Sequence, residues 1–571
     1  MTSRISATRK RKVPDFFSPL SAQEEKQVIQ VLRTSLRQFP EDLLDSDDEV
    51  GEEEEIQEDS EEESEQSDSD DERERKTPYE IKWTRDPKTV VVKDFNQPSG
   101  PTKSLPSSKN VKHFFDLLFS QKVLSMICRM TNLYAEQRMQ LKPDTEWKEL
   151  GIGELKAWIG CLIAMGLNKQ PNIKMYWDQN WKLEVVANRF TRKRFLSIRK
   201  YLHLVDNTSI TNLTTDRLAK IRPLKDLLVK NFRDNYMPER YLTVDEDICK
   251  FKGRSVMKQY LKSKMIKWGY KIWKLCDAAT SYVLNFDVYG GVKERKKETN
   301  LAYNVVMELL EGYLDKNYTV FMDNFFSSIP LYFDLLNRST YACGTVRPNR
   351  KYLPEGFGEQ QDMEPGEDEF WQSGNFVATI WQDKRSTSFL STCCTPEGSD
   401  TVQRHRRKEG KLTLSCPPAV KLYTKYMGGV DRSDRMVRTY SVSRQSKKWW
   451  FRLFYYFLDT ALANSFILYN HSSNHLQLSE LEYLKQLSYA LISTFSQDEK
   501  IQPRRKRKGR EVVSLPRRVA GNHWPVLTTK QQRCQYCARP GSKTPRSQYS
   551  CEACKVHLCI DKCFKHYHTR R

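Results

Sequence analysis

The chain has 571 residues, of which 38% are hydrophobic, and it carries a formal net charge of +21. Globular domains usually hold about 45–50% apolar residues, so part of this chain is predicted to be unfolded. Residues 41–75 hold 21 Asp and Glu against two Arg, which leaves +40 on the other 536 residues and favours a polyanionic partner, either nucleic acid or an anionic membrane surface. The first twelve residues contain no apolar stretch, so we expect no secretory signal and no disulfide framework.

Residues 1–105 are predicted to be disordered, because a basic head is followed by the acidic, Ser-rich run and by a polar segment with several prolines. From 106 to 240 apolar residues recur at spacings of three and four, which predicts a helical domain. We group residues 441–500 with this helical domain.

The long apolar stretch Trp449–Tyr469 has nearly the length of a membrane span. Arg452, Asp459 and Asn464 lie inside it, and each of them would be costly in lipid. We therefore expect a buried or amphipathic helix here, and no membrane as a partner.

Residues 241–350 change to the alternation of strands, as in YLTVDEDICKF, and then alternate helices with strands. This order predicts an α/β domain, to which we assign residues 416–440 as well. Residues 351–415 are polar with short strand-like runs, which predicts a β-rich insertion. Residues 501–530 read as a basic linker, and residues 531–571 as a cysteine-rich domain.

Three aspartates each follow an apolar residue at the end of a predicted element: Asp245 in LTVDE, Asp323 in VFMDN and Asp431 in MGGVD. Carboxylates are preferred ligands of Mg²⁺ and Mn²⁺, and two such ions about 3.5–4 Å apart can assist the cleavage of a phosphodiester bond. Their spacing alone leaves open that they are ordinary capping or turn residues.

Four stretches, YLTVDEDICKFKGR, VFMDNFFSS, CGTVRPNR and YMGGVDRSD, occur in this order and together resemble the piggyBac family of transposases. The resemblance covers about residues 110–470, and the cysteine-rich tail matches as well. It implies an α/β fold with an RNase H-like catalytic core, a helical dimerisation and DNA-binding domain, a β-rich insertion and a C-terminal zinc-binding domain.

The resemblance also implies that Asp245, Asp323 and Asp431 are catalytic and hold two Mg²⁺ or Mn²⁺ ions. Asp434 falls on a further acidic position and is a candidate fourth ligand or orienting group. In a strand, Glu246 would point away from Asp245 and Asp247 would share its face. The resemblance favours neither of these two as a ligand.

The activity implied by the resemblance is cut-and-paste transposition of DNA. Transposon ends would be nicked by hydrolysis, closed into hairpins, reopened and joined to target DNA, typically at TTAA. The expected partners are double-stranded DNA, in the form of terminal inverted repeats and target DNA, and a second copy of the chain. The alternative is a domesticated, transposase-derived DNA-binding protein without transposition activity.

Basic residues near the acidic motifs are candidate DNA contacts. Lys252 and Arg254 follow Asp245, and Arg347 and Arg350 follow the predicted strand after Asp323. They are expected to hold phosphates without reading sequence, although ordinary solvated charge explains any one of them equally well.

Lys448 and Trp449 begin the apolar stretch described above, in RQSKKWWFR. An aromatic ring beside cations can stack on an unpaired base, which would suit hairpin formation. The alternative is that Trp449 and its neighbour Trp450 belong to the protein core.

The tail carries thiolate and imidazole ligands in paired spacing, which predicts two zinc ions. The candidate ligands are Cys534, Cys537, Cys551, Cys554, Cys559, Cys563, His566 and His568. A cross-braced arrangement would pair Cys534 and Cys537 with Cys559 and Cys563. The second ion would then take Cys551, Cys554, His568 and either His566 or His557.

The resemblance makes this zinc domain the part that recognises the transposon ends, and a protein–protein zinc module is the alternative. The stretch PRRKRKGR at residues 503–510 is typical of a nuclear localisation signal, so we expect a nuclear protein. The same basic run can equally serve as a DNA-binding linker.

Overall fold

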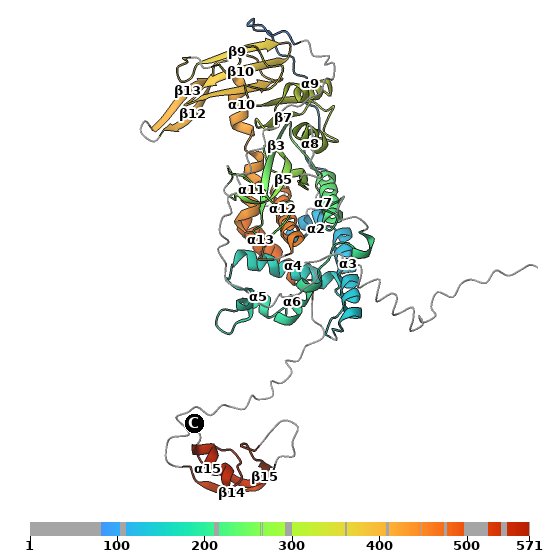
Figure 1. The fold of residues 1–571 in the computed structure, drawn as a ribbon, viewed down its shortest axis with the longest axis vertical. Coiled ribbons are helices and arrows are strands. Elements are labelled where there is room, and N and C mark those ends of the chain that lie inside the picture. The colour runs from blue at the N-terminus through green and yellow to red at the C-terminus, as the bar shows by residue number, and fades with distance from the viewer. Residues whose placement is uncertain are drawn as a thin grey trace, which may run out of the picture. The chain divides into compact units, whose positions relative to one another are not determined.

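The protein forms two compact units, residues 1–495 and residues 496–571, and each is described by itself (Figure 1). The computed structural model describes residues 81–102, 110–144, 146–210, 216–262, 264, 266–291, 300–359, 362–406, 410–446, 448–472, 477–495, 523–537 and 545–569. The predicted disorder of residues 1–80 and the basic run 503–510 lie outside these described residues.

The first unit begins with the predicted helical segment. Its helices are α2 (Val111–Leu118), α3 (Gln121–Leu141), α4 (Ile152–Leu167), α5 (Glu184–Ala187), α6 (Arg192–Tyr201) and α7 (Arg222–Asn235), with the 3₁₀ turns η1 (Ile173–Trp177) and η2 (Asn207–Ser209) between them. Polar caps fix where two of them start, because the Asn110 side chain accepts the Lys112 amide and that of Thr191 accepts the Arg194 amide.

A nine-stranded mixed sheet follows. Its strands are β3 (Tyr241–Lys250), β4 (Gln259–Tyr260), β5 (Trp268–Asp277), β6 (Val283–Val288), β7 (Thr319–Met322), β8 (Tyr341–Thr345), β9 (Asp368–Ser373), β10 (Phe376–Gln382) and β11 (Ser386–Ser391). The order is β4-β5-β3-β7-β8-β11-β10-β9, and β6 also pairs with β5. The pairs β3–β7 and β7–β8 are parallel, since the helices α8 (Leu301–Leu309) and α9 (Ile329–Asn337) interrupt the chain between strands.

The segment expected to be a β-rich insertion is not a separate sheet throughout. Its strands β9, β10 and β11 extend the main sheet, because β11 pairs with β8. Only β12 (Asp400–Arg406) and β13 (Gly410–Cys416) form a hairpin of their own. The helices α10 (Pro418–Tyr426) and α11 (Gly429–Thr439) then return to the sheet, where α11 packs on β3 and β5.

Residues 81–102 are ordered against the sheet, in contrast to the disorder expected for them. Thr84 forms a β-bridge with Gln372 of β9. The Gln372 side chain accepts the Lys88 amide at 2.7 Å and donates to the Lys88 carbonyl at 2.9 Å. Further on, β1 (Gly100–Pro101) pairs with β2 (Tyr236–Met237). Each of these contacts uses backbone groups of the segment, which any residue type offers, so composition does not reveal them. Val90 is also buried, and Trp83 and Phe95 pack against the core.

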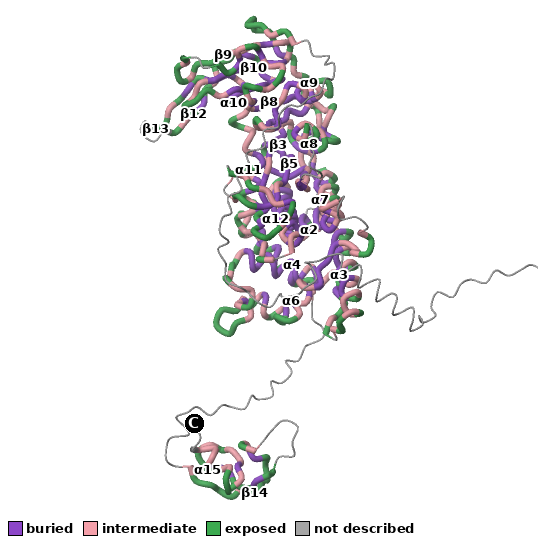
Figure 2. The backbone as a smooth tube through the Cα atoms, viewed as in Figure 1, coloured by how far each residue is buried: buried purple, intermediate pink, exposed green. Residues whose placement is uncertain are grey.

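The apolar stretch at 449–469 is confirmed as a buried helix, α12 (Trp449–His471), which packs against α2 and α11 (Figure 2). Its polar residues are satisfied inside the protein: Asn464 bonds both the amide and the carbonyl of Val283, at 2.9 and 2.8 Å. The helix α13 (Glu480–Ile492) packs against α4. Among the described residues, no helix combines the length and apolarity that crossing a bilayer requires.

The second unit contains β14 (Pro525–Arg533), β15 (Arg546–Cys551) and α15 (Lys562–Thr569). β14 and β15 pair antiparallel, and Pro525 lies opposite Cys551. Residues 523–530, which we had assigned to the basic linker, therefore belong to the folded cysteine-rich unit.

Candidate active site and metal-binding groups

Parallel pairing of β3 with β7 brings two of the predicted catalytic aspartates together. Val244 lies opposite Met322 in the register, so Asp245 and Asp323 are the next residue on each strand. Asp245 is buried and Asp323 is half-buried at the point where β7 ends.

Glu246 joins this pair, so the carboxylate group consists of Asp245, Glu246 and Asp323. One oxygen from each lies within 4.8 Å of the others. Oε2 of Glu246 is buried and has no hydrogen-bond partner among the residues that the structure describes. Strict alternation predicted that Glu246 would point away from Asp245. β7 stops at Met322 while β3 continues to Lys250, so Glu246 lies beyond the stretch in which the two strands pair.

The carboxylate group concentrates negative charge in a poorly solvated place. Burial raises the pKa of Asp245 well above its usual value, and the neighbouring carboxylates of Glu246 and Asp323 raise it further, whereas the Lys264 ammonium lowers it. Burial and the Glu246 carboxylate likewise raise the pKa of Asp323. Such a group is stabilised by a cation at its centre.

Asp431 lies beside the carboxylate group but outside it. It stands in the first turn of α11 with its side chain 72% exposed. Nζ of Lys264 lies 3.9 Å from the Asp431 carboxylate and 3.7 Å from that of Asp245, so one ammonium lies between the two. Gly429 permits the approach of α11 to β3, because a Cβ at this position would lie 2.9 Å from Oγ1 of Thr243.

Asp434 faces a different set of partners. Its carboxylate accepts from Nζ of Lys274 at 2.7 Å, and Lys274 also contacts Asp247 at 3.3 Å. Arg438 and the Tyr456 hydroxyl complete the bonding of Asp247. All of Lys274, Asp247 and Asp434 are buried, and the two cations hold the pKa of Asp247 low against the effect of burial. The structure thus places Asp434 in an internal ion network and not with Asp245.

The residues after Asp323 hold it in place. The Phe325 amide donates to Oδ1 of Asp323 at 3.0 Å, and Oγ of Ser327 donates to the Asp323 carbonyl at 3.0 Å. Arg350, a candidate DNA contact, donates to the Phe325 carbonyl at 2.9 Å. Lys271 covers the Phe325 ring at 4.3 Å. The motif MDNFF therefore fixes the orientation of the carboxylate.

The second unit gathers two groups of metal-ligating side chains. The first consists of Cys534, Cys537, Cys559 and Cys563, which is the cross-braced set expected from the sequence. Sγ of Cys537 and Sγ of Cys563 are 2.9 Å apart. The Cys559 amide donates to Sγ of Cys534 at 3.3 Å, a bond that favours the thiolate form.

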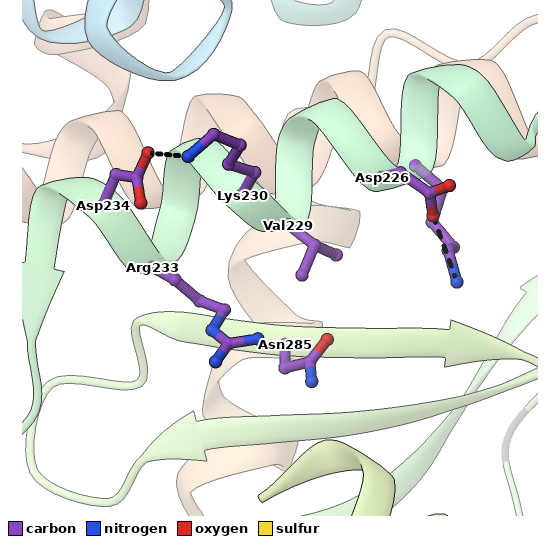
Figure 3. A pocket seen from close by; sticks show the side chains of 7 residues that line it. Asp226, Val229, Lys230, Arg233, Asp234 and Asn285 are labelled. Carbon is purple, nitrogen blue, oxygen red and sulfur yellow. Dashed lines mark hydrogen bonds and ion pairs between the residues drawn. The ribbon is translucent and has the colours of Figure 1, made fainter. Parts of the chain in front are cut away.

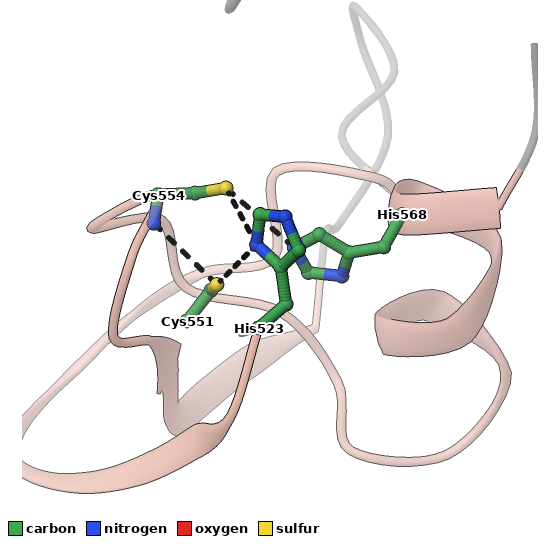
Figure 4. A group of neighbouring side chains, drawn as sticks. All are labelled: His523, Cys551, Cys554 and His568. Carbon is green, nitrogen blue, oxygen red and sulfur yellow. Dashed lines mark hydrogen bonds between the residues drawn. The ribbon is translucent and has the colours of Figure 1, made fainter. Parts of the chain in front are cut away.

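The second group consists of His523, Cys551, Cys554 and His568 (Figure 4). Nδ1 of His523 lies 3.4 Å from both sulfurs, and Nε2 of His568 lies 3.6 Å from that of Cys554. Nδ1 of His568 bonds the Phe564 carbonyl at 2.8 Å, which leaves Nε2 as the ligating nitrogen.

His566 and His557, the two candidates for the last ligand, lie elsewhere. The His566 ring stacks with that of Tyr536 at 6.0 Å, and Nδ1 of His557 lies 3.1 Å from the Ser547 carbonyl. Sequence reasoning missed His523 because it precedes Cys551 by 28 residues and has no motif spacing to it. The pairing of Pro525 with Cys551 is what brings it close.

A family model described as transposase IS4 matches residues 110–466. This chain belongs to the piggyBac-type transposase family. Among its curated relatives, human (Homo sapiens) PiggyBac transposable element-derived protein 2 is 27% identical over 474 residues, covering 80% of this chain and 76% of the relative. Human PiggyBac transposable element-derived protein 3 is 26% identical over 514 residues, covering 87% and 82%.

A solved structure also matches this piggyBac-family chain. It is a cryo-EM structure of the piggyBac transposase synaptic complex with hairpin DNA. The match has a TM-score of 0.64 at 26% sequence identity and covers 81% of this chain and 98% of that chain. The mixed α/β fold is thus similar to that of a piggyBac transposase.

The candidate DNA contacts of this piggyBac-family chain differ in exposure. Lys252 and Arg254 are exposed in the loop after β3, whereas Arg347 is half-buried. Lys448 is half-buried, with Nζ 3.5 Å from the Lys200 carbonyl. Trp449 is half-buried and its ring meets Tyr270 edge-on at 6.4 Å, while Trp450 is fully buried. Trp450 therefore belongs to the protein core, whereas Trp449 keeps part of its surface exposed.

A shallow pocket of about 420 Å³ lies elsewhere in this unit, between α7 and β6 (Figure 3). Lys230 in its wall pairs with Asp234 at 2.7 Å, and Lys225 pairs with Asp287 at 2.6 Å. The pocket includes none of the carboxylate group, and its charges are largely compensated, so we do not assign the chemistry to it.

Proposed function

We propose that this piggyBac-family chain is a metal-dependent DNA transposase that excises and integrates a mobile element. The observation that carries the proposal is the convergence of Asp245, Glu246 and Asp323 at the ends of paired parallel strands. Three carboxylates with oxygens within 4.8 Å of one another repel unless a cation joins them.

The carboxylate group fits Mg²⁺ or Mn²⁺. Its donors are all hard oxygens, and the buried Oε2 of Glu246 lacks a partner. Asp245, Glu246 and Asp323 would hold a first ion. A second ion held by Asp245 and Asp431 would take the place of the Lys264 ammonium that lies between them. Bound ions of this kind activate water or a 3′-hydroxyl and stabilise the leaving oxygen of a phosphodiester.

The chain's own cations would orient the DNA. Lys264 lies between Asp245 and Asp431, and Lys271 lies over Phe325 beside Asp323. Both ammonium groups can contact phosphate oxygens next to the carboxylates. Lys252, Arg254 and Arg347 would extend these phosphate contacts, while Arg350 acts through the loop that holds Asp323.

The remaining expectations are part of the same proposal. Membership of the family supports an RNase H-like core, hairpin intermediates, TTAA target sites, dimers and action in the nucleus. The two ligand groups of the second unit suit two zinc ions, because cysteine with histidine in sets of four is the usual composition of structural zinc sites. Recognition of transposon ends by this unit is the role we propose for it.

A second candidate function is sequence-specific DNA binding without transposition. The exposed position of Asp431, outside the carboxylate group, favours it. The curated relatives carry names that describe them as derived from transposable elements.

An excision assay on a transposon with the repeats that flank this gene distinguishes the two functions. Wild-type protein is expected to excise the element, and Asp323→Asn is expected to abolish excision while retaining duplex binding. Asp226→Asn, a substitution of an aspartate whose side chain is 60% exposed on α7, is the matched control and should excise normally. Excision that survives Asp323→Asn would overturn the catalytic assignment, and no excision by the wild type would favour the second function.

A further inference from the structure

An exposed pair of aromatic rings lies on the edge of the sheet that carries the carboxylate group. Tyr260 is 40% exposed and Trp268 is 45% exposed, although both are large apolar side chains. Their ring centroids are 4.8 Å apart, with an interplanar angle of 50°. Exposed rings that touch each other but are not covered by the core are candidates for a binding surface.

The backbone beneath these rings is hydrogen-bonded between β4 and β5. Tyr260 and Trp268 lie directly opposite each other in the β4–β5 pairing. The Phe251 amide donates to the Trp268 carbonyl at 3.3 Å, and the Leu261 amide donates to that of Lys267 at 2.8 Å. The ring pair is thus held in place before any ligand arrives, which lowers the ordering cost of binding.

Cations surround the pair. Nζ of Lys258 lies 4.7 Å from the centroid of the Trp268 ring. Lys252, Arg254 and Lys262 are exposed in the same loop region, and among the described residues none of these cations forms an ion pair. Aromatic rings flanked by unpaired cations are the combination with which proteins bind single-stranded nucleic acid. A purely apolar partner would offer no anionic group to interact with these cations.

The ring pair also lies at a useful distance from the carboxylate group. Lys250 is paired with Gly269, next to Trp268, and lies five residues beyond Asp245 on β3. At roughly 3.3 Å per residue this is about 17 Å, a distance that a few nucleotides of an unpaired strand span. A strand cleaved at Asp245 would therefore reach the rings.

We propose that Tyr260 and Trp268 form a platform on which unpaired bases of a DNA strand stack, with Lys258 and the neighbouring basic residues holding its phosphates. This platform takes over the role that the sequence suggested for Trp449, which is half-buried against Tyr270. The proposal deepens the proposed function and rests on it only for the origin of the strand.

Fluorescence anisotropy with a labelled oligothymidylate of about 15 nucleotides tests the platform, within the 4–16 nucleotides that such sites usually span. Full-length protein is used without added Mg²⁺ or Mn²⁺, so hydrolysis plays no part. Stacking on one base implies that Trp268→Ala weakens binding by about 5- to 160-fold. Trp268→Phe should retain most of the affinity, and Trp181→Ala, which removes a tryptophan that is 63% exposed elsewhere, should retain all of it.

An oligonucleotide of the same length with abasic sites separates stacking from charge. It should bind Trp268→Ala and wild-type protein equally, because it has phosphates but no bases. Equal losses on both oligonucleotides, or none on oligothymidylate, would overturn the platform. If Trp268→Ala changes only the oligomeric state, the rings form an interface between copies of the chain, and the platform is overturned as well. Oligonucleotide binding tests the platform, and the expected loss of excision in Asp323→Asn tests the proposed function. Failure of the one and failure of the other therefore give different results.

Discussion

His523 is the residue whose substitution best tests the second metal group. It takes the place of the fourth ligand, for which the sequence offered His566 or His557. Nδ1 of His523 lies 3.4 Å from the sulfurs of Cys551 and Cys554. If each group in the second unit holds one zinc ion, His523→Ala removes one of four ligands from one ion and leaves the other group intact.

The expected loss follows from the energy of such sites. Structural zinc in small domains contributes roughly 10–16 kcal/mol, so one ligand of four is worth about 2.5–4 kcal/mol. At about 1.4 kcal/mol per factor of ten, His523→Ala should weaken the second ion by roughly 60- to 700-fold. Under competition with a chromophoric chelator, the wild type should keep two ions and the variant one, as measured by zinc content per chain.

The matched controls are His566→Ala and His557→Ala. Neither side chain belongs to a metal group, so both variants should keep two ions under the same competition. Loss of one ion in either control, together with full zinc content in His523→Ala, would refute the reasoning.

Three further substitutions test the first unit. Glu246→Gln should weaken Mn²⁺ binding, measured by titration calorimetry without DNA, by at least the roughly 10- to 100-fold that loss of an outer-shell partner costs. Lys274→Met leaves two buried carboxylates with one cation fewer and should destabilise the unit by about 3–5 kcal/mol, seen as a lower midpoint of thermal unfolding. Burial raises the pKa of Asp459 to about 7, although Ser441 and Val442 donate to it. Because the folded state keeps this proton, stability falls as the pH rises from about 4 to 7, by up to about 4 kcal/mol, and Asp459→Asn should remove that fall.

Each of these three predictions would be contradicted by a different result. Unchanged Mn²⁺ affinity in Glu246→Gln would show that the carboxylate group does not act as one site. Lys271→Met is the control for Lys274→Met, since Lys271 is only half-buried, and an equal shift in both midpoints would contradict the role of the buried network. If Asp459→Asn and the wild type lose stability in parallel between pH 4 and 7, another group carries the pH dependence.

Several features could be predicted because they depend on local pattern. The buried helix at 449–469 follows from continuous apolarity with a few polar residues, and α12 satisfies those residues internally. Asp245 and Asp323 each end an apolar run, so a common location was a reasonable expectation. The C-x₂-C pairs at 534–537 and 551–554 remain together in the structure, because two ligands so close along the chain can reach one ion.

Other features depend on contacts between distant residues. Glu246 belongs to the carboxylate group and lies beyond the end of β7, and strand length relative to a neighbour is not encoded locally. Asp434 faces Lys274, a buried lysine that nothing in the sequence of β5 distinguishes from an exposed one. The signal that could have been noticed is the run Asp245-Glu246-Asp247, since three acids in a buried strand require partners.

The sequence by itself determined which residue types are present for chemistry: acids after apolar strands, thiols in pairs, and cations around them. The tertiary structure decided which of them meet. Register placed Asp245 beside Asp323 and His523 beside Cys551, while helix packing directed Asp434 inward and left Asp431 exposed. The physical reason is that a carboxylate or an imidazole takes its role from the charges and donors around it, and those come mostly from residues far away in the chain.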